Sequence, residues 1–491
     1  MANNALLDNL PQSTAIVCPQ HGNVSYPQLQ KLSEQFAFQL EELQVQPNDR
    51  VIICGSRSAH YIAAILGVLS VGASYVPVFE KSPASRAQVI AENSGAKVAI
   101  VDTKGQSLFQ GLQFIDLDAP GNDGIERAIR MNSGLCYLLY TSGSTGAPKG
   151  VAVPRTAVEH YAHWAANHFD LTVDSNVLCT APFYFDMSVF DVFATLLARA
   201  TLVIANDKHL MFPKLLVQLI QEQKISHWKG VSSLLHYIVK MGALDGQELL
   251  SLKYVLFGGE KINNNHLAAW MELVPHARYY NAYGPTETTG VSSCYHVQSP
   301  PAASDNLPIG LARQGTEILV LNEQREPCST NENGEIFIGG AGLSDGYWND
   351  ETKTANAFLE INGKRFYKSG DIGHYREDGN LAFVERKDNQ IKVQGYRIEL
   401  GEVAAGVLTQ TQVSEAAAIA VENPSGEQEI AVAYTVKQHE KLDEKELRKY
   451  LMQSLPKYMQ PKHVLLLDAL PLTDRGKTDT ALLRKRLFEK S

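Results

Sequence analysis

Hydrophobic and polar positions in the first hundred residues alternate between two spacings. Between residues 26 and 45 apolar side chains recur at roughly helical intervals, whereas residues 50–54 hold a short apolar run that is typical of a buried strand. The same two patterns then repeat along the chain. Strands that alternate with helices indicate parallel sheets covered by helices. The pattern predicts helices over 26–45, 58–71 and 83–94, and strands over 50–54, 75–78 and 98–101.

The alternation recurs between Asn176 and Ala282, where residues 202–204 and 254–257 are further strand candidates. We therefore expect two parallel-rich αβ subdomains within one large unit. From about residue 305, short alternating runs separated by Gly, Asn and Asp replace this pattern and predict an antiparallel β region. Its strand candidates are residues 317–321, 334–338 and 381–384.

After Asp388 the chain mixes strand and helix patterns over about 100 residues, a common size for a small domain. We therefore predict an α/β fold with a large N-terminal domain, residues 1–387, and a small, mobile α+β C-terminal domain, residues 388–491. The small domain is predicted to hold strands at 390–393, 415–421, 429–436 and 463–468, and helices at 400–408, 443–453 and 479–488.

Composition narrows the functional classes. Hydrophobic residues make up 44% of the 491 residues. The net charge is -9 and no stretch is strongly basic. This charge distribution argues against nucleic acid and anionic membranes as partners. No apolar stretch approaches the roughly 20 residues of a membrane helix, and the N-terminus lacks a secretory signal pattern. The 6 cysteines show no CxxC spacing, which favours reduced thiols. We expect a cytoplasmic protein.

The segment 140–150 consists largely of small and hydroxyl-bearing residues and follows the apolar run 135–139. Small residues let the backbone approach a charged ligand closely, and hydroxyls and backbone N–H groups can donate to phosphate oxygens. A P-loop requires Ser or Thr after its lysine, whereas Gly150 follows Lys149 here. The segment therefore predicts another kind of phosphate-binding loop. Its candidate ligands are Thr141, Ser142, Gly143, Ser144, Thr145, Gly146 and Lys149.

This loop resembles the phosphate loop of the adenylate-forming superfamily, which comprises acyl-CoA synthetases, luciferases and the adenylation domains of nonribosomal peptide synthetases. Further segments occur in the order typical of that family, so the resemblance spans about residues 24 to 480, nearly the whole chain. These segments are Val24–Leu29, Gly72–Val78, Phe185–Val189, Asn281–Glu287, Tyr367–Asp371, Arg386–Glu399, Leu455–Met459 and Pro471–Lys477.

The resemblance implies an enzyme that uses ATP and Mg²⁺ to convert a carboxylate into an acyl-AMP. Because both reacting partners are anions, such catalysis is mainly positioning and charge neutralisation. The loop would hold the β and γ phosphates, and Thr145 and Glu287 would help to bind Mg²⁺. Tyr283 would stack on adenine, and Asp371 would accept from both ribose hydroxyls. Further nucleotide contacts implied by motif position are Asn281, Ala282, Gly284, Thr286 and Arg386; Glu385 stands where the family usually has Gly before that arginine.

The family also uses one site for two half-reactions, and the resemblance assigns three residues to that alternation. Lys477 would be the catalytic lysine that bridges the substrate carboxylate and the α-phosphate. Asp388 would be the hinge about which the small domain rotates. After rotation, the loop around Gly395 would face the site, where glycine lets a pantetheine arm pass close to the backbone.

Asp186 is the most informative residue for the substrate. Amino-acid-activating members of the family have an aspartate at this position, where it binds the α-ammonium group, and a buried carboxylate needs such a cation. The resemblance therefore favours an amino acid over other carboxylic acids. The remaining predicted substrate-pocket positions are Met187, Phe190, Lys229, Leu256, Gly258, Ala282, Gly290 and Val291.

Lys229 leaves two alternatives open. If its side chain enters the pocket, it needs an anion, which an aspartate- or glutamate-like substrate would supply. Otherwise it pairs with an acid of the protein or points outward. A slip of one residue would place Trp228 or Gly230 in the pocket wall instead.

No carrier-type or condensation-type motif follows Lys477, so the sequence suggests a stand-alone adenylation enzyme. The acyl acceptor is then expected to be the phosphopantetheine thiol of a carrier protein acting in trans. A D-alanine–carrier protein ligase, or an acyl-CoA synthetase for another small carboxylate, is the alternative.

Overall fold

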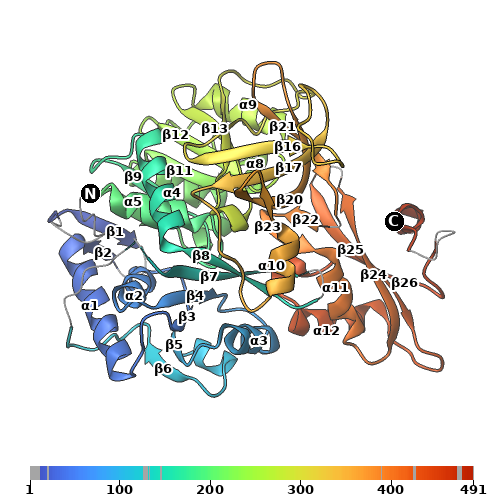
Figure 1. The fold of residues 1–491 in the computed structure, drawn as a ribbon, viewed down its shortest axis with the longest axis horizontal. Helices are drawn as coiled ribbons and strands as arrows, with labels where there is room; N and C mark the ends of the chain where they lie inside the picture. Colours follow the sequence, from blue (N-terminus) through green and yellow to red (C-terminus); the bar gives the residue numbers. More distant parts are fainter. Residues whose placement is uncertain are drawn as a thin grey trace.

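The computed structural model describes residues 11–18, 22–124, 131, 133–143, 146–388, 390–423, 427–472 and 478–489. It shows the predicted α/β architecture, with a large N-terminal domain and a small C-terminal domain that lies to one side of it (Figure 1). Two large sheets and an antiparallel β region build the large domain. No helix in the described part of the chain is long and apolar enough to cross a membrane.

A seven-stranded sheet carries the glycine-rich loop. Its strand order is β18-β8-β7-β4-β3-β5-β6, in which β7, β4, β3, β5 and β6 are parallel and the other neighbours antiparallel. The central parallel strands are buried on both faces, as their continuous apolar sequences require. The strands are β3 (Arg50–Cys54), β4 (Ser74–Val78), β5 (Val98–Val101), β6 (Gln113–Asp116), β7 (Leu135–Thr141), β8 (Lys149–Pro154) and β18 (Gly346–Tyr347).

A nine-stranded sheet forms the second half of the large domain. Its order is β15-β14-β13-β12-β11-β9-β10-β1-β2, and the strands from β13 to β1 are parallel. The strands are β1 (Thr14–Cys18), β2 (Gly22–Ser25), β9 (Asn176–Cys179), β10 (Thr201–Ile204), β11 (His227–Val231), β12 (Tyr254–Gly258), β13 (Arg278–Tyr283), β14 (Ser293–Val297) and β15 (Leu311–Ala312).

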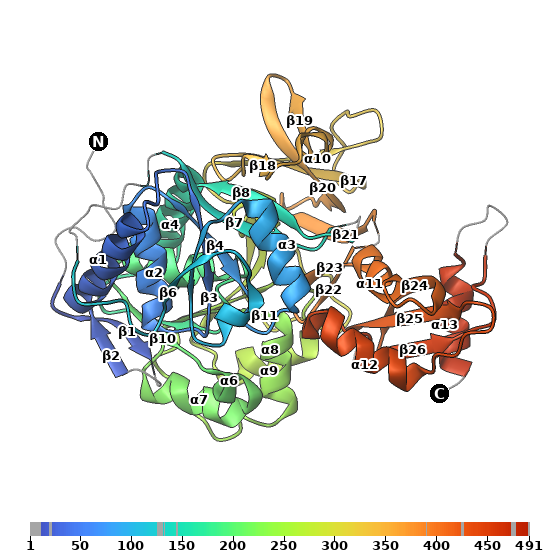
Figure 2. The same ribbon diagram turned by 90° about the horizontal axis from the view of Figure 1, so that it is seen from below.

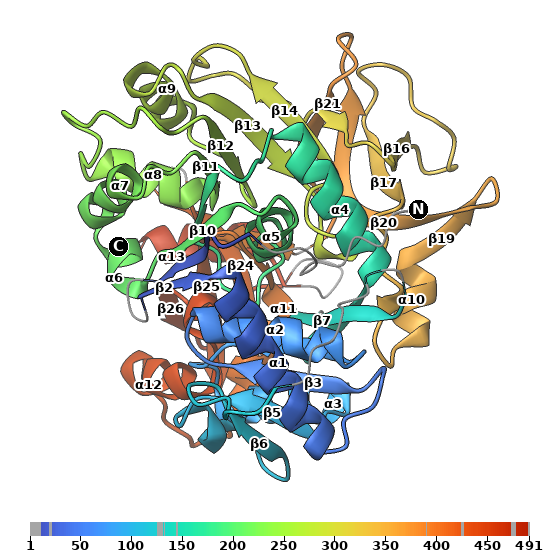
Figure 3. The ribbon, with the colours of Figure 1, turned by 90° about the vertical axis from the view of Figure 1, so that its left-hand side faces the viewer.

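Helices fill three layers around these two sheets. The largest core cluster joins facing sides of both sheets to α1, α2 and α4, so these helices lie between the sheets. Separate clusters pack α7, α8 and α9 on the outer face of the nine-stranded sheet and α3 on that of the seven-stranded sheet. Figure 3 shows these layers in order. The helices are α1 (Tyr26–Glu42), α2 (Ala59–Ser70), α3 (Ala84–Ser94), α4 (Arg155–His168), α5 (Thr195–Leu197), α6 (Asp207–Met211), α7 (Pro213–Glu222), α8 (Ser232–Lys240) and α9 (Asn264–Leu273).

The antiparallel β region and the small domain complete the fold. A five-stranded antiparallel sheet follows the nine-stranded sheet, and a hairpin then leads into a three-stranded sheet packed by helices. In Figure 2 the small domain lies at the right, with α13 on the side away from the large domain. The elements are β16 (Thr316–Leu321), β17 (Gly334–Gly340), α10 (Glu351–Ala357), β19 (Phe358–Ile361), β20 (Lys364–Tyr375), β21 (Leu381–Arg386), β22 (Gln390–Val393), β23 (Tyr396–Glu399), α11 (Leu400–Leu408), β24 (Val413–Glu422), β25 (Gln428–Val436), α12 (Glu444–Ser454), β26 (His463–Leu466) and α13 (Thr480–Glu489).

The predicted helices and strands match the structure to within a few residues at each end. The prediction did not name many elements of the large domain, among them helices α4, α7, α8 and α9 and strands β11, β13 and β14. It also missed β1, which is mostly buried and second from the edge of its sheet, and the short edge strand β2. β1 pairs in parallel with β10, almost two hundred residues later in the sequence, so only the tertiary fold shows that it is a strand of the second sheet. All six cysteines are free thiols, as their spacing predicted.

Candidate functional site

The glycine-rich loop joins two antiparallel strands at the end of the seven-stranded sheet. β7 ends at Thr141 and β8 begins at Lys149, and these two residues are directly paired. A Cβ atom on Gly143 would lie 2.0 Å from the carbonyl oxygen of Ala147, so only glycine fits this turn. The predicted ligands Ser144 and Thr145 lie outside the described residues.

Glu287 lies near Lys149, at the end of this loop, and is completely buried. Hydrogen-bond donors surround its carboxylate. The Tyr347 hydroxyl donates to its Oε1 at 2.7 Å, Arg397 Nη1 donates to its Oε2 at 2.7 Å, and Lys149 Nζ lies 3.7 Å from Oε1. Burial would raise the pKa of Glu287, but Arg397 and Lys149 outweigh it and lower the pKa to about 2. Glu287 is therefore a fixed negative charge beside the loop.

Three residues that the resemblance assigns to the nucleotide form one hydrogen-bonded group. The Tyr283 hydroxyl donates to Asp371 Oδ2, and Arg386 Nη1 donates to Asp371 Oδ1, both at 2.5 Å. Arg386 also forms a two-pronged ion pair with Asp388, the predicted hinge, at 2.7 Å for both contacts. The predicted nucleotide residues and the predicted hinge residue are thus in direct contact.

One cavity combines the predicted nucleotide and substrate residues. Asn281 lies outside its lining, because its side-chain amide donates to the Pro308 carbonyl at 2.8 Å. Phe190 and Leu256 are fully buried and also lie outside the lining. The predicted residues that line the cavity are Asp186, Met187, Lys229, Gly258, Ala282, Tyr283, Gly284, Thr286, Gly290, Val291, Asp371, Arg386 and Gly395.

Asp186 lies in this cavity with a single hydrogen-bond donor from the described residues. The Thr286 hydroxyl donates to its Oδ2 at 2.6 Å, and 7% of the residue is exposed. Burial raises the pKa of Asp186, while Thr286, Lys229 and Lys392 act in the opposite direction. An ammonium group bound at this carboxylate would relieve the cost of its burial.

Lys229, on β11, lines the same cavity and is only 3% exposed. Its ammonium donates to the Tyr161 hydroxyl at 3.3 Å and lies over the rings of Tyr161 and Phe190. Trp228 instead packs in the α8–α9 core, so the side chain at position 229 is the one that faces the cavity. No carboxylate of the described residues forms an ion pair with Lys229.

A buried acid nevertheless lies within electrostatic range of Lys229. Asp191 is completely buried, and burial raises its pKa to about 7 even though Lys229 lowers it. Neither carboxylate oxygen of Asp191 has a hydrogen-bond partner of good geometry among the described residues. Behind the cavity wall, Lys229 is therefore accompanied by a buried acid whose pKa burial raises.

The β22–β23 hairpin of the small domain closes one side of a groove on the large domain. Gly395, at the hairpin turn, has a φ of +79°, and its Cα would lie 3.4 Å from a Cβ atom on Gly259. The loop around Gly395 thus faces the site in this structure. The groove has a volume of about 1010 Å³ and shares Lys229 and Lys392 with the substrate cavity.

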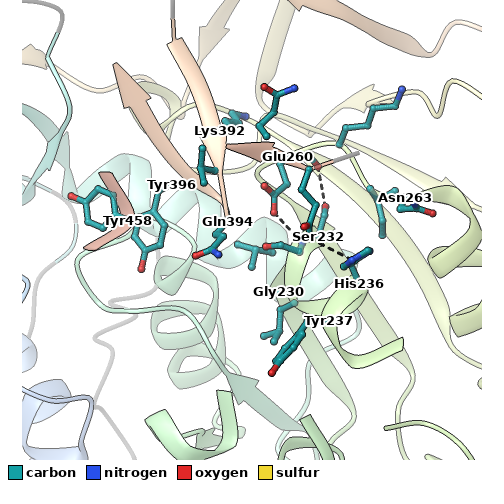
Figure 4. Close-up of a pocket in the computed structure, with 18 of the residues that line it drawn as sticks. Gly230, Ser232, His236, Tyr237, Glu260, Asn263, Lys392, Gln394, Tyr396 and Tyr458 are labelled. Carbon is teal, nitrogen blue, oxygen red and sulfur yellow. Dashed lines mark hydrogen bonds and ion pairs between the residues drawn. The ribbon is translucent and has the colours of Figure 1, made fainter. Parts of the chain in front are cut away.

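Figure 4 shows how the two domains contribute to this groove. Gln394 and Tyr396 come from the hairpin, and Gly230, Ser232 and His236 face them from the large domain. The Tyr396 ring stacks on Tyr458, with centroids 4.2 Å apart. The groove and the predicted substrate cavity are neighbours that share Lys229 and Lys392.

Sequence reasoning missed several charged residues of the site. Arg397 and Lys392 belong to the segment Arg386–Glu399, from which the sequence analysis chose Gly395 as a site residue but neither basic residue. The position of Arg397, two residues after Gly395, could have indicated that it also reaches the site. Tyr347, Arg86 and Glu402 carry no local signal, because their partners lie far away in the sequence. Lys477 lies outside the described residues.

Comparison with known proteins supplies the family context. The model of the AMP-binding enzyme family matches residues 4–348, and that of the AMP-binding enzyme C-terminal domain matches residues 402–477. Together these matches include the glycine-rich loop, the part of the cavity that the large domain contributes up to residue 348, and most of the small domain.

Similar sequences and structures agree with these matches. A linear gramicidin synthase of Brevibacillus parabrevis is 35% identical over 489 residues, which is 97% of this chain and 9% of that protein. Malpibaldin synthetase of Mortierella alpina is 35% identical over 96% of this chain and 9% of its own length. The chain thus spans about a tenth of these relatives. The structure of holo-PA1221, a nonribosomal peptide synthetase protein with adenylation and carrier domains, superposes with a TM-score of 0.85 at 28% identity, covering 98% of this chain and 83% of that one.

Proposed function

The chain belongs to the AMP-binding enzyme family of adenylate-forming ligases, and from this premise we propose that it activates an amino acid as aminoacyl-AMP and transfers it to a carrier-protein thiol. The observation that carries the proposal is the position of Asp186. This buried carboxylate lines the same cavity as the nucleotide residues Asp371 and Arg386. The similarity of the chain to parts of peptide synthetases supports the same class of substrate.

In the first half-reaction, a substrate carboxylate oxygen bonds to the α-phosphorus of ATP as the bond to the β-phosphate breaks, and pyrophosphate leaves. Asp186 would hold the substrate ammonium, and the glycine-rich loop with Lys149 would hold the departing phosphates. Lys477, by resemblance, would neutralise the carboxylate and the α-phosphate. The described residues thus orient two anions and offset their repulsion.

Magnesium fits this site at Glu287. That carboxylate is fully buried and ionised, and a single carboxylate together with substrate phosphates is a common way to bind the ion. Among the described residues no group of three or more acidic, histidine or cysteine side chains could hold a metal ion. When bound, Mg²⁺ would neutralise charge on the leaving pyrophosphate.

In the second half-reaction, a thiolate would attack the acyl carbonyl, a thioester would form and AMP would leave. The groove beside Gly395 supports a long thiol arm as the nucleophile, because it lies between the two domains and shares Lys229 and Lys392 with the substrate cavity. The phosphopantetheine of a carrier protein in trans is the arm that we propose. Coenzyme A carries the same arm and is the alternative acceptor.

Amino-acid-dependent exchange of labelled pyrophosphate into ATP tests the proposal. We expect at least one of the twenty standard amino acids or its D-enantiomer to support exchange, and Asp186→Ala to lower it at least about 30-fold through loss of a buried ion pair. Asp174→Ala changes an exposed aspartate and should leave exchange unchanged. Exchange with fatty or aryl acids alone would refute the amino-acid assignment. If the enzyme loads coenzyme A and not a carrier protein, coenzyme A is the acceptor and the proposed carrier protein is wrong.

A further inference from the structure

Two histidines of the large domain lie side by side at the groove between the domains. His236, in the middle of α8, lines the groove (Figure 4), and His266 is in the first turn of α9. Their Nδ1 atoms are 2.7 Å apart, and the planes of their rings meet at 87°. The two imidazoles therefore share one hydrogen bond. We refer to them as the histidine pair.

This hydrogen bond fixes where the histidine pair can hold its protons. One Nδ1 atom must donate and the other accept, so a single proton lies between the rings. In the neutral pair the acceptor ring has its own proton at Nε2, whereas the Nε2 atom of the donor ring is bare. A further proton gives the pair one positive charge and occupies that bare atom. The charged pair therefore always offers a donor at His236 Nε2.

The small domain presents a carboxylate to this atom. Glu427, directly before β25, places its Oε1 atom 3.4 Å from His236 Nε2. Asn423 Nδ2 donates to Glu427 Oε2 at 2.9 Å and so holds the carboxylate in place. His236 Nε2 is buried and has no hydrogen bond of good geometry among the described residues. Its attraction to Glu427 is therefore electrostatic and depends on the charge of the histidine pair.

Other charged groups near the histidine pair have partners of their own or belong to the large domain. Glu429 pairs with His463 at 2.9 Å within the small domain, and Glu260 accepts from a backbone amide in the first turn of α8 at 3.0 Å. Glu427 is thus the acid that reaches the histidine pair across the domain boundary. The charged groups of these elements and of the segments beside them that line the groove are Lys240, Glu260, Lys261, Glu422, Glu429 and Lys462.

Glu427 couples protonation of the histidine pair to the position of the small domain. Burial and the positive charge of a protonated His236 lower the pKa of His266, Glu427 raises it, and Lys240 lowers it. The effect of Glu427 exists only while the small domain is in its present place. A proton on the pair and this domain arrangement therefore stabilise each other. The arrangement gains stability as the pH falls through the range in which imidazole titrates, and loses it as the pH rises.

We infer that the histidine pair and Glu427 form a proton-operated latch, which holds the small domain in its present arrangement while the pair is charged and releases it when the pair is neutral. The latch acts at the segment between β24 and β25 and needs no nucleotide or amino acid. Only its consequence rests on the proposed function. If the arrangement with Gly395 at the site serves the thiol half-reaction, a lower pH favours that half-reaction.

Single-molecule energy transfer on the full chain, without nucleotide, amino acid or metal, tests the latch. Dyes attached at Lys214→Cys on α7 and Lys445→Cys on α12 report the position of the small domain. Cys294→Ser and Cys328→Ser prevent other labelling, because the remaining four cysteines are buried.

The measured quantity is the ratio of molecules whose transfer efficiency matches the present arrangement to all other molecules. We expect this ratio to rise about threefold between pH 8 and pH 6, the size expected for one partly exposed ion pair. A ratio that does not change with pH would overturn the inference.

Two variants separate the latch from other effects of pH. Glu427→Gln keeps the size of the side chain but removes its charge, so we expect the ratio to become independent of pH. His236→Gln removes the titrating group and should have the same effect. A threefold rise that persists in Glu427→Gln would overturn the inference. Circular dichroism monitors folding, and Glu427→Gln alone decides if His236→Gln is unfolded, because the Glu427 side chain is 42% exposed.

Glu429→Gln is the matched control. It removes the same charge two residues away, where the carboxylate pairs with His463 inside the small domain, so the threefold rise should remain. Loss of the rise in this variant too would assign the effect to the overall charge of the small domain and overturn the latch. Because the measurement uses no substrate, a failed latch and a failed exchange assay are distinguishable.

Discussion

At the residue scale, the substrate cavity is defined by two buried charges of opposite sign. Asp186 has one hydroxyl donor, and Lys229 has one hydroxyl acceptor and two aromatic rings. Both are left with unused hydrogen-bonding capacity toward the cavity. An amino acid with an acidic side chain offers an ammonium for the first and a carboxylate for the second.

Lys229→Met tests this match. If the side-chain carboxylate of the substrate pairs with Lys229, the variant should lose at least about 30-fold in kcat/KM for aspartate or glutamate, because a buried charge would lose its partner. Pyrophosphate exchange measures this loss. Lys214→Met, an exposed position on α7, is the matched control.

The structure also offers a role for Lys229 if its substitution has no effect on pyrophosphate exchange. If a neutral amino acid is preferred and Lys229→Met leaves its exchange unchanged, the ammonium serves the protein through Tyr161 and the nearby Asp191. Lys229 lowers the pKa of Asp191, which burial raises to about 7, so this acid is close enough to share the charge of the lysine.

At the element scale, the β22–β23 hairpin connects the two halves of the site. Its strands carry Lys392 toward the substrate cavity and Arg397 toward Glu287, while its turn places Gly395 at Val231. Lys392 and Arg397 are directly paired across the hairpin, so their side chains lie on one face of it, and both line the same cavity. A single short element therefore brings two basic side chains to the site.

Gly395→Ala tests the role of the hairpin turn. The new Cβ atom would lie 2.3 Å from Val231 Cγ1, on a backbone with φ of +79°, so the hairpin could not stay in its present position. We expect carrier loading from supplied aminoacyl-AMP to fall about tenfold or more, because such strain costs of order 1–3 kcal/mol. Pyrophosphate exchange should be largely retained.

Gly363→Ala provides the matched control for backbone strain. Gly363 has a φ of +73°, but a Cβ atom there would meet nothing within 4 Å. If this variant loses carrier loading to the same extent, general strain and not the contact with Val231 explains the effect. Equal loss of both half-reactions in Gly395→Ala would contradict the proposed role of the hairpin.

At the scale of the whole molecule, the present arrangement brings the hairpin to the site and leaves α13 on the far side of the small domain (Figure 2). α13 begins at Thr480, shortly after Lys477 in the sequence. The proposed alternation requires the small domain to rotate, so that Lys477 serves the first half-reaction and the hairpin the second.

Lys477→Ala tests this division of labour. Loss of a positive charge aimed at the developing transition state should reduce pyrophosphate exchange about 10²–10³-fold. Thioester formation from supplied aminoacyl-AMP should remain largely intact, since another face of the small domain serves that step. Lys445→Ala, an exposed position on α12, is the control. A parallel loss of both steps would contradict the rotation.

The sequence by itself determined the types and order of many elements, chiefly in the first hundred residues and in the small domain, and the composition of the phosphate loop. Periodicity predicted helices such as α1 and strands such as β3, because their side-chain patterns are local. The loop was recognisable because glycine and hydroxyl residues are required wherever a backbone approaches phosphate. Asp186 and Lys229 were also identified from their motifs and do face one cavity.

Only the tertiary structure decided which charges meet. Arg397 contacts Glu287 across 110 residues of sequence, and Glu402 contacts Gly143 across 259. Such pairs depend on how the small domain is placed against the large one, and no periodicity or spacing carries that information. The same holds for β1, whose pairing with β10 is non-local. Local patterns fix elements and loops, whereas the packing of distant surfaces decides the partner of each buried charge.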